Sequence, residues 1–315
     1  MLKEAELKEA ITQLKIEKNA VIMAHYYQED VIQDIADVVG DSLALAQQAA
    51  QTKADIILLS GVYFMGETAK ILSPEKKVLV PDVKAGCSLA DSCPAEDFAA
   101  FKAKHPGHTV VTYVNTTAAV KALSDIVVTS TNAVGVINSI PSDQPILFGP
   151  DRNLGAYLQS LTGRKMVLWD GACHVHEQFS IEKIVALKKE NPGALLIAHP
   201  ECKQPLLVMA DFIGSTAALL KYTQKEKHAQ FIVATEAGIL HQMRKASPSK
   251  TFIPAPPSDS SCACNDCEFM KLNTLEKIYL ALKNERPEVL IDETVRRQAV
   301  VPIERMLDIS SQLNL

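Results

Sequence analysis

Three cysteines occupy corresponding places in a long repeat of this chain, and their spacing is the first chemical signal in the sequence. Each repeat holds a polar residue at the end of an apolar run, a hydroxyl residue 17 positions later, and a cysteine a further 45, 43 or 51 positions on. The three sets are His25, Ser42 and Cys87; Tyr113, Ser130 and Cys173; His199, Thr216 and Cys267. One thiol from each repeat could therefore reach a common axis.

Three converging thiolates are well suited to a metal centre. They can hold three corners of a 4Fe–4S cubane and leave the fourth iron open to act as a Lewis acid on a substrate. Zinc is the alternative occupant, because three thiolates and a water also form a tetrahedral site with one open position. Thiolate ligation alone does not separate these two metals.

The remaining cysteines have several interpretations. A CxCxxC segment ends at Cys267 and could be half of a zinc site, although no second CxxC or histidine pair lies nearby. Cys262 and Cys264 could also form a redox-sensitive pair or have no role. Cys93 would break the common spacing if it were the ligand, and Cys202 is most simply a buried thiol.

The hydroxyl residues of the repeat each precede an apolar stretch that is typical of a helix. Ser42, Ser130 and Thr216 are therefore predicted to cap helix N-termini. Unpaired N–H groups and the positive end of the helix dipole attract anions, so three such termini could bind a small polyanion without lysine or arginine. The alternative is that these hydroxyls only cap helices.

A second polar residue follows each strand end two positions later, and alternation along an extended segment would place both on one side. The pairs are His25 and Tyr27, Tyr113 and Asn115, and His199 and Glu201. The tyrosines and the glutamate are candidate proton carriers beside a metal, provided that burial shifts their pKa toward neutrality. Each one taken alone could equally be an ordinary hydrogen-bonding residue.

The elements that must position these groups are short β-branched runs alternating with helical stretches, which is typical of β-α-β units with a parallel sheet. Ligands of open parallel sheets gather beyond the carboxyl ends of the strands, where the repeated residues are expected to lie. Helices are predicted at Asp41–Lys53 and Met65–Leu72. The predicted strands are Ala20–Ala24, Asp55–Leu59, Lys77–Val80, Thr109–Val114, Asp125–Thr129, Ile146–Phe148, Lys165–Trp169, Ala194–Ala198, Phe212–Ile213, Gln230–Ala234 and Thr251–Ile253.

The repeat also predicts the domain organisation. A chain of 315 residues with 47% hydrophobic residues can bury a large core. The period of 88 and then 86 residues is the size of a small complete layered unit rather than a solenoid repeat. We therefore expect three α/β modules at 1–86, 87–172 and 173–267, with C-terminal helices in 268–315 packing on the first.

Composition excludes several classes of protein. The net charge is −5, with 32 Lys and Arg against 37 Asp and Glu, so neither nucleic acid nor a membrane surface is an expected partner. The N-terminus is charged and amphipathic rather than a signal peptide, and no apolar run reaches transmembrane length. A cytoplasmic location follows, where seven cysteines favour metal binding or catalysis over disulfides.

Longer motifs in the chain resemble the quinolinate synthase family over essentially its whole length. They include His25-Tyr-Tyr-Gln, Gly86-Cys-Ser-Leu-Ala-Asp-Ser-Cys, Tyr113-Val-Asn-Thr-Thr-Ala-Ala-Val-Lys, Trp169-Asp-Gly-Ala-Cys-His-Val-His, His199-Pro-Glu and Ala234-Thr-Glu. The resemblance implies three similar α/β/α modules around a pseudo-threefold axis and an oxygen-sensitive 4Fe–4S cluster with one open iron. It also implies condensation of iminoaspartate with dihydroxyacetone phosphate to quinolinate, phosphate and water in de novo NAD biosynthesis.

The resemblance further implies roles for individual residues. The implied cluster ligands are Cys87, Cys173 and Cys267. The implied substrate contacts are His25, Ser42, Tyr113, Asn115, Ser130, His199, Glu201 and Thr216, and the residues implied in proton transfer are Tyr27, Tyr113 and Glu201. A transient contact with an L-aspartate oxidase or dehydrogenase is the implied protein partnership. A noncatalytic iron–sulfur sensor and a zinc-dependent aldolase or hydrolase are the alternatives.

Overall fold

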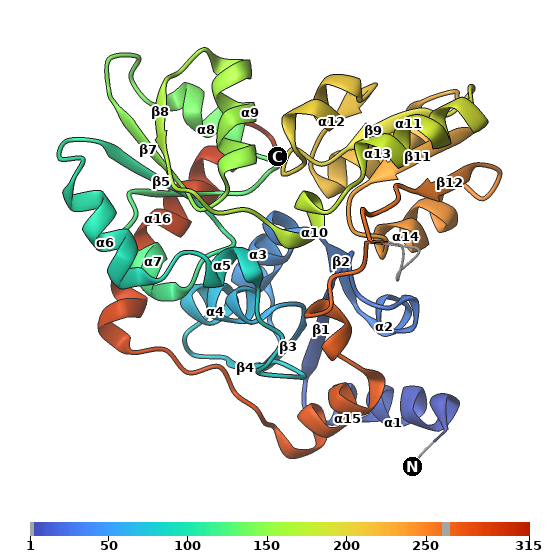
Figure 1. Ribbon diagram of the computed structural model, residues 1–315. Coiled ribbons are helices and arrows are strands. Elements are labelled where there is room, and N and C mark those ends of the chain that lie inside the picture. The colour runs from blue at the N-terminus through green and yellow to red at the C-terminus, as the bar shows by residue number, and fades with distance from the viewer. Residues whose placement is uncertain (1–2, 260–264) are drawn as a thin grey trace.

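Three small sheets of the same design make up the framework of the protein. The structure is a computed structural model that describes residues 3–259 and 265–315. Each sheet has four strands, and all neighbouring strands are parallel. The sheet orders are β2-β1-β3-β4, β6-β5-β7-β8 and β10-β9-β11-β12, so the same order occurs three times. The predicted α/β class with three modules is confirmed (Figure 1).

The strands follow the apolar runs of the sequence closely, because central parallel strands are covered on both faces and must be apolar throughout. All five residues of β3 are buried. The first sheet contains β1 Ala20–His25, β2 Val38–Gly40, β3 Ile56–Ser60 and β4 Lys77–Leu79; the second β5 Thr109–Tyr113, β6 Ile126–Val128, β7 Ile146–Gly149 and β8 Met166–Leu168; the third β9 Leu195–Ala198, β10 Phe212–Ile213, β11 Gln230–Ala234 and β12 Thr251–Pro254. Only β2, with three residues at a sheet edge, was absent from the prediction.

The helices connect these strands and cover the sheets (Figure 1). The first module contains α1 Glu4–Glu17, α2 Asp30–Ile35, α3 Ser42–Gln51 and α4 Tyr63–Leu72. The second contains α5 Ser88–Asp91, α6 Ala95–Ala103, α7 Ala118–Ala122, α8 Ala133–Ser139 and α9 Arg152–Thr162. The third contains α10 His174–Glu177, α11 Ile181–Glu190, α12 Gln204–Met209, α13 Thr216–Lys225 and α14 Ile239–Ala246, and the chain ends with η1 Met270–Leu272, α15 Leu275–Asn284 and α16 Glu293–Gln312.

One side-chain hydrogen bond occurs in all three modules and marks them as copies of a single design. An aspartate before the second strand accepts the N–H of the residue 15 positions earlier, in the first strand. The acceptors are Asp37, Asp125 and Asp211, with N···O distances of 2.8, 2.8 and 2.7 Å. Because the same bond fixes the same pair of strands in each module, the pseudo-threefold repeat extends from sequence spacing to hydrogen bonding.

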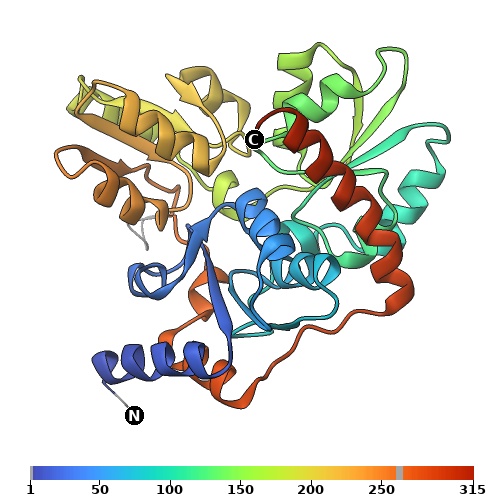
Figure 2. The same cartoon turned by 180° about the vertical axis from the view of Figure 1, so that it is seen from behind.

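The two C-terminal helices pack on different modules, which corrects one prediction. α15 packs against α1 and β3 of the first module, whereas α16 packs mainly against α7 and β6 of the second and also contacts α4 of the first. The prediction that 268–315 packs on the first module therefore describes α15 but only a small part of the α16 packing. Ala299, Ile303 and Met306 of α16 are fully buried in the core that contains Val127 of the edge strand β6. Figure 2 shows this helix crossing the back of the second module.

The modules also differ in how they share their cores. One large apolar cluster joins the first two modules and α16, whereas most of the buried apolar residues of the third module form two separate clusters. Contacts between the third module and the others therefore depend more on polar groups, which gather at the centre. Among the described residues, no helix combines the length and apolar character needed to cross a lipid bilayer.

Candidate active site

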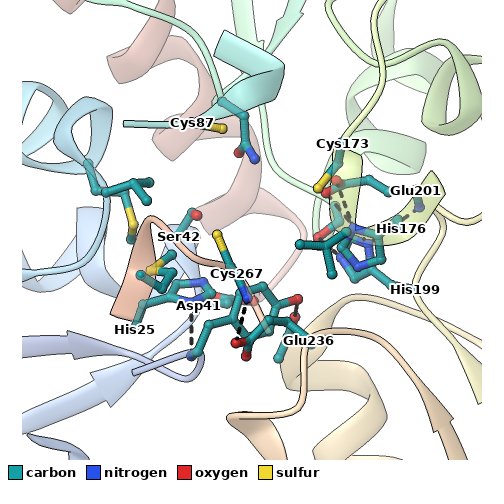
Figure 3. Close-up of a pocket in the computed structure, with 18 of the residues that line it drawn as sticks. His25, Asp41, Ser42, Cys87, Cys173, His176, His199, Glu201, Glu236 and Cys267 are labelled. Atoms are coloured by element: carbon teal, nitrogen blue, oxygen red, sulfur yellow. Dashed lines mark hydrogen bonds and ion pairs between the residues drawn. The ribbon is translucent and has the colours of Figure 1, made fainter. Parts of the chain in front are cut away.

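A central cavity collects side chains from all three modules (Figure 3). The space between these side chains is about 660 Å³ and is partly open to solvent. The residues predicted for the site all line it, namely His25, Tyr27, Ser42, Cys87, Tyr113, Asn115, Ser130, Cys173, His199, Glu201, Thr216 and Cys267. The carboxyl ends of parallel strands thus bring widely separated segments together, as open α/β sheets do.

Two of the predicted helix caps are displaced by one residue. Asp41 and Ser215 are the N-caps of α3 and α13, and each side chain accepts the N–H three residues later at 3.0 and 3.3 Å. Ser42 and Thr216 are instead the first helical residues and line the cavity. The prediction that these two hydroxyls cap the helices is therefore wrong, because the preceding side chain already satisfies the free N–H.

The second module differs more. Ser130 lies before Asn132, the N-cap of α8, and hydrogen-bonds His199 Nε2 at 3.2 Å instead of capping the helix. Its neighbour Thr131 joins the three modules, since its hydroxyl donates to Asp41 at 2.8 Å and lies 2.8 Å from the Ser215 hydroxyl. The three helix starts therefore meet at one point, as the sequence spacing predicted.

The three repeat cysteines face the cavity as free thiols (Figure 3). Cys87 and Cys173 precede the short helices α5 and α10, so each lies on a tight connection after its sheet. Burial raises the pKa of Cys87 to about 12 and that of Cys267 to about 11, and it raises the pKa of Cys173 well above its usual value. Because the thiol proton is firmly held, these sulfurs become thiolates only when a bound cation replaces that proton.

The three sulfurs are not gathered closely enough for a single ion. Three thiolates on a single zinc, at about 2.3 Å each, would lie only about 3.8 Å from one another. In the described part of the chain, the only His, Cys, Asp or Glu ligand atoms that form a group of three within 4.8 Å belong to Cys173, His176 and Glu201. At least one pair of the cysteine sulfurs therefore lies farther apart than 4.8 Å.

Of the other cysteines, the two that the structure describes do not line this cavity. Cys93 and Cys202 are fully buried elsewhere, and the Cys202 thiol donates to the Ala234 carbonyl at 3.4 Å. Both fit the interpretation of a buried apolar thiol. Cys262 and Cys264 lie outside the described residues.

The strand-end pairs share the cavity, although a turn and not strand alternation brings them together. Tyr27 N–H donates to His25 Nδ1 at 3.2 Å, and Glu201 N–H donates to His199 Nδ1 at 3.4 Å. Each imidazole thus closes its own turn and keeps its proton on Nε2. For these two pairs the expected extended segment is therefore wrong, because the chain bends directly after the strand and the imidazole accepts the N–H.

Glu201 is the electrostatic centre of the cavity. Its Oε1 accepts the Tyr113 hydroxyl at 2.6 Å, and its Oε2 lies 3.2 Å from Nδ1 of His176. Burial opposes the charge, but the imidazoles of His176 and His199 and the Tyr113 hydrogen bond together hold the pKa of Glu201 at about 2. Burial and the Glu201 charge raise the pKa of Tyr113 well above its usual value. The shared proton therefore resides on the tyrosine.

A hydrogen-bonded chain links Tyr27 to His176, a histidine beside Glu201 that the sequence analysis left without a role. His176 Nε2 lies 3.1 Å from the Thr235 hydroxyl, which lies 2.7 Å from the Tyr27 hydroxyl. The Tyr27 hydroxyl also lies 2.7 Å from that of Thr216. His176 follows Cys173 by three residues, and this Cys-x-x-His spacing on a helix is the signal that could have revealed it.

Two buried carboxylates each accept the backbone N–H of one repeat cysteine. Asp151 accepts the N–H of Cys173 at 3.3 Å with one oxygen and that of Leu154, at the start of α9, at 2.7 Å with the other. Glu236 accepts the N–H of Cys267 at 3.1 Å and that of Gly238, at the start of α14, at 2.7 Å. Both carboxylates are fully buried and lie two residues after the third strand of their sheet.

Replacing either carboxylate should weaken the hydrogen bonds that fix the backbone of the neighbouring cysteine. In Asp151→Asn or Glu236→Gln, an NH2 group faces a buried backbone N–H, which costs about 1–3 kcal/mol of unfolding free energy. We expect a lower urea midpoint for the cluster-free protein and fewer iron atoms bound per chain after anaerobic reconstitution. Glu177→Gln is the matched control, since Glu177 is partly exposed and lies outside the cavity. Equal iron content in all three variants would show that the carboxylates do not position the cysteines.

Two buried imidazoles should make the cluster-free protein sensitive to acid. Burial lowers the pKa of His25 and of His199 to about 3, against the opposing attraction of Glu201. An unfolded histidine titrates near 6.5, so the unfolded state binds more protons between pH 6.5 and 3, and stability falls as the pH is lowered. Each histidine should remove about 1.4 kcal/mol per pH unit in this window. Urea unfolding across pH should show a shallower slope for His25→Gln and His199→Gln; an unchanged slope would contradict the assignment.

The geometry defines a triplicated α/β protein whose strand ends and thiols enclose one ligand site. The family described as "Quinolinate synthetase A protein" matches residues 9–308. The quinolinate synthase from Synechococcus sp. is 60% identical over 307 residues, which cover 98% of this chain and 96% of that protein. The quinolinate synthase from Nostoc sp. is 61% identical over 302 residues, which cover 96% of this chain and 93% of that protein. The relative from Thermosynechococcus vestitus is 58% identical over 305 residues, covering 97% of this chain and 96% of its own. The chain belongs to the quinolinate synthase family.

Proposed function

We propose that this protein is a quinolinate synthase of de novo NAD biosynthesis. It condenses iminoaspartate with dihydroxyacetone phosphate, and one phosphate and two waters leave as the pyridine ring of quinolinate closes. The observation that supports this most is the shared cavity, in which three repeat cysteines lie beside an ionised, buried glutamate and two tyrosines. Its relatives carry the same name at about 60% identity over nearly their whole length.

In this proposal Cys87, Cys173 and Cys267 hold a 4Fe–4S cluster. Their free thiols line one cavity and do not form a group within 4.8 Å, and this supports a cluster over a single zinc. When bound, the cluster supplies an open iron that acts as a Lewis acid in dehydration and ring closure.

The substrates are anionic, and the cavity offers neutral donors to them. No lysine or arginine is among its described lining residues. The N-termini of α3 and α13, each ten residues long, direct their first turns and the hydroxyls of Ser42 and Thr216 to this space. Helix N-termini favour carboxylate and phosphate groups. The other proposed substrate contacts are His25, Tyr113, Asn115, Ser130, His199 and Glu201.

Two hydrogen-bonded sets of groups can move protons in the cavity. Glu201 is ionised, and Tyr113 holds a proton 2.6 Å away that it can supply. Tyr27 lies in a second hydrogen-bonded chain, formed with the Thr216 and Thr235 hydroxyls. We assign Glu201 to the late proton transfers and Tyr27 to the triose oxygens. A noncatalytic iron–sulfur protein would have no need of these groups.

The proposal also concerns where the enzyme works. Free thiols that serve as metal ligands require a reducing compartment, so we place the protein in the cytoplasm. Iminoaspartate is unstable, and a transient contact with the L-aspartate oxidase or dehydrogenase that supplies it would shorten its path.

An anaerobic assay tests the proposed function. The protein is purified without oxygen, its iron and sulfide are counted, and quinolinate is measured from iminoaspartate and dihydroxyacetone phosphate. We expect a brown protein with about four irons per chain that forms quinolinate. A brown protein without turnover would indicate an iron–sulfur sensor, and a colourless zinc protein would indicate the zinc-dependent alternative; either result would overturn the proposal.

A further inference from the structure

We propose that the cluster-free protein binds one divalent transition-metal ion, of the class of zinc or ferrous iron, through Cys173, His176 and Glu201. This site uses only one of the three repeat cysteines. The ion site itself does not depend on the proposed function, whereas its competition with a cluster does.

The three ligand atoms are already gathered. They lie within 4.8 Å of one another, in a group that no other described residues match. His176 Nδ1 and Glu201 Oε2 are 3.2 Å apart, close to the value of about 3.4 Å for two ligands bound to one tetrahedral zinc at about 2.0–2.1 Å. Cys173 and His176 are the N-cap and the third residue of α10, so their side chains share one turn. The sulfur therefore has only a short distance to close.

The facing polar atoms point to a missing cation. His176 and Glu201 are 2% and 3% exposed, and neither His176 Nδ1 nor Glu201 Oε2 has a hydrogen-bond partner. His176 Nε2 lies 3.1 Å from the Thr235 hydroxyl, and donation there leaves a lone pair on Nδ1. A lone pair and an ionised carboxylate oxygen then face each other in a buried space. A bound cation satisfies both atoms.

The surroundings resemble those of metal sites in general. A metal-bound histidine commonly donates its second ring N–H to an oxygen, and a metal-bound carboxylate commonly accepts a further hydrogen bond. Thr235 can serve the histidine in this way, and Tyr113 serves the carboxylate through Glu201 Oε1 at 2.6 Å. One sulfur, one nitrogen and one oxygen favour zinc, cobalt or ferrous iron over magnesium or calcium.

Occupation of this site has a consequence for cluster assembly. Cys87 and Cys267 do not belong to the group of atoms within 4.8 Å, so they stay free when the ion binds. The ion nevertheless takes Cys173, which a three-cysteine cluster needs. The single ion and the cluster therefore exclude each other, and zinc should slow cluster assembly until a chelator removes it.

A cobalt titration tests the site. Cluster-free protein carrying Cys262→Ser and Cys264→Ser, which removes the two cysteines outside the described residues, is titrated anaerobically with Co²⁺ and then with Zn²⁺. We expect one Co²⁺ per chain with a thiolate charge-transfer band, displaced by Zn²⁺. Cys173→Ser, His176→Ala and Glu201→Gln should each weaken binding at least about tenfold. The matched controls Cys87→Ser and Cys267→Ser should leave the band and the affinity unchanged.

A second measurement needs no substitution at the site. Zinc should protect Cys173 from alkylation while Cys87 and Cys267 react, as peptide mass spectrometry can show. Equal protection of all three cysteines, or loss of cobalt binding in Cys87→Ser, would show that the three thiols bind the ion together and would overturn the proposal. Absence of a thiolate band would overturn it too. Quinolinate formation by the reconstituted enzyme is measured separately, so failure of the ion site and failure of the proposed function are distinguishable.

Discussion

Serine in place of Cys87, Cys173 or Cys267 should abolish quinolinate formation in every case. Each cysteine comes from a different repeat, and neither Cys93 nor Cys202, the other cysteines that the structure describes, lines the cavity. Loss of one thiolate removes a corner of the cluster, and with it the Lewis acid that is worth several kcal/mol in the transition state. We expect a fall in kcat of at least about 10³-fold. Iron, sulfide and quinolinate are measured after anaerobic reconstitution of each variant.

The buried cysteines provide the matched controls for this series. Cys93→Ala and Cys202→Ala remove thiols that are fully buried outside the cavity, so iron content and turnover should stay close to those of the unsubstituted protein. Cys93 is the decisive control, because it follows Cys87 by six residues. If Cys93→Ala lost the cluster while Cys87→Ser retained it, the proposed ligand set would be wrong.

Much of the framework could be predicted because the spacing of the repeated residues reflects the same arrangement of strands and helices in each module. β1 ends at His25 and α3 begins at Ser42. In this interval of 17 residues the chain forms α2 and β2 and comes back to the carboxyl edge of the same sheet. Apolar runs identified the buried strands, since parallel strands need apolar residues on both faces. β2 was not predicted because a strand of three residues at a sheet edge is too short to show a hydrophobic pattern. The position of α16 was not predicted because an amphipathic helix does not specify which apolar surface it covers.

The site was predictable where it repeats and not where it is specific to one module. The aligned strand ends and cysteines revealed the cavity-lining groups, although Ser42 and Thr216 proved to be one residue past the caps. His176 has no counterpart in the repeat that was used to find the others. Asp151 and Glu236 act through backbone N–H groups, and a sequence gives no sign of which N–H a distant carboxylate accepts.

Glutamine in place of Glu201 should remove most of the turnover while the cluster stays bound. The amide oxygen can still accept the Tyr113 hydroxyl, and the amide NH2 can donate to His176 Nδ1, so the shape of the site is kept. What is lost is the buried negative charge of a carboxylate whose pKa of about 2 keeps it ionised. Loss of a general acid–base group lowers kcat by about 10²- to 10⁴-fold. Anaerobic assays should show this fall with unchanged visible absorption.

The comparison with a second glutamate isolates the chemical role of Glu201. Glu177 belongs to the same module, forms ion pairs with Arg152 and Lys203, and does not line the cavity, so Glu177→Gln should leave kcat unchanged. Full turnover in Glu201→Gln would rule out the proton-transfer role. Loss of iron together with turnover would make Glu201 a residue that positions the neighbouring thiol instead. Because the amide can keep the Tyr113 hydrogen bond while the charge is removed, a fall in kcat with an intact cluster and an unchanged KM is the outcome expected for a role in proton transfer.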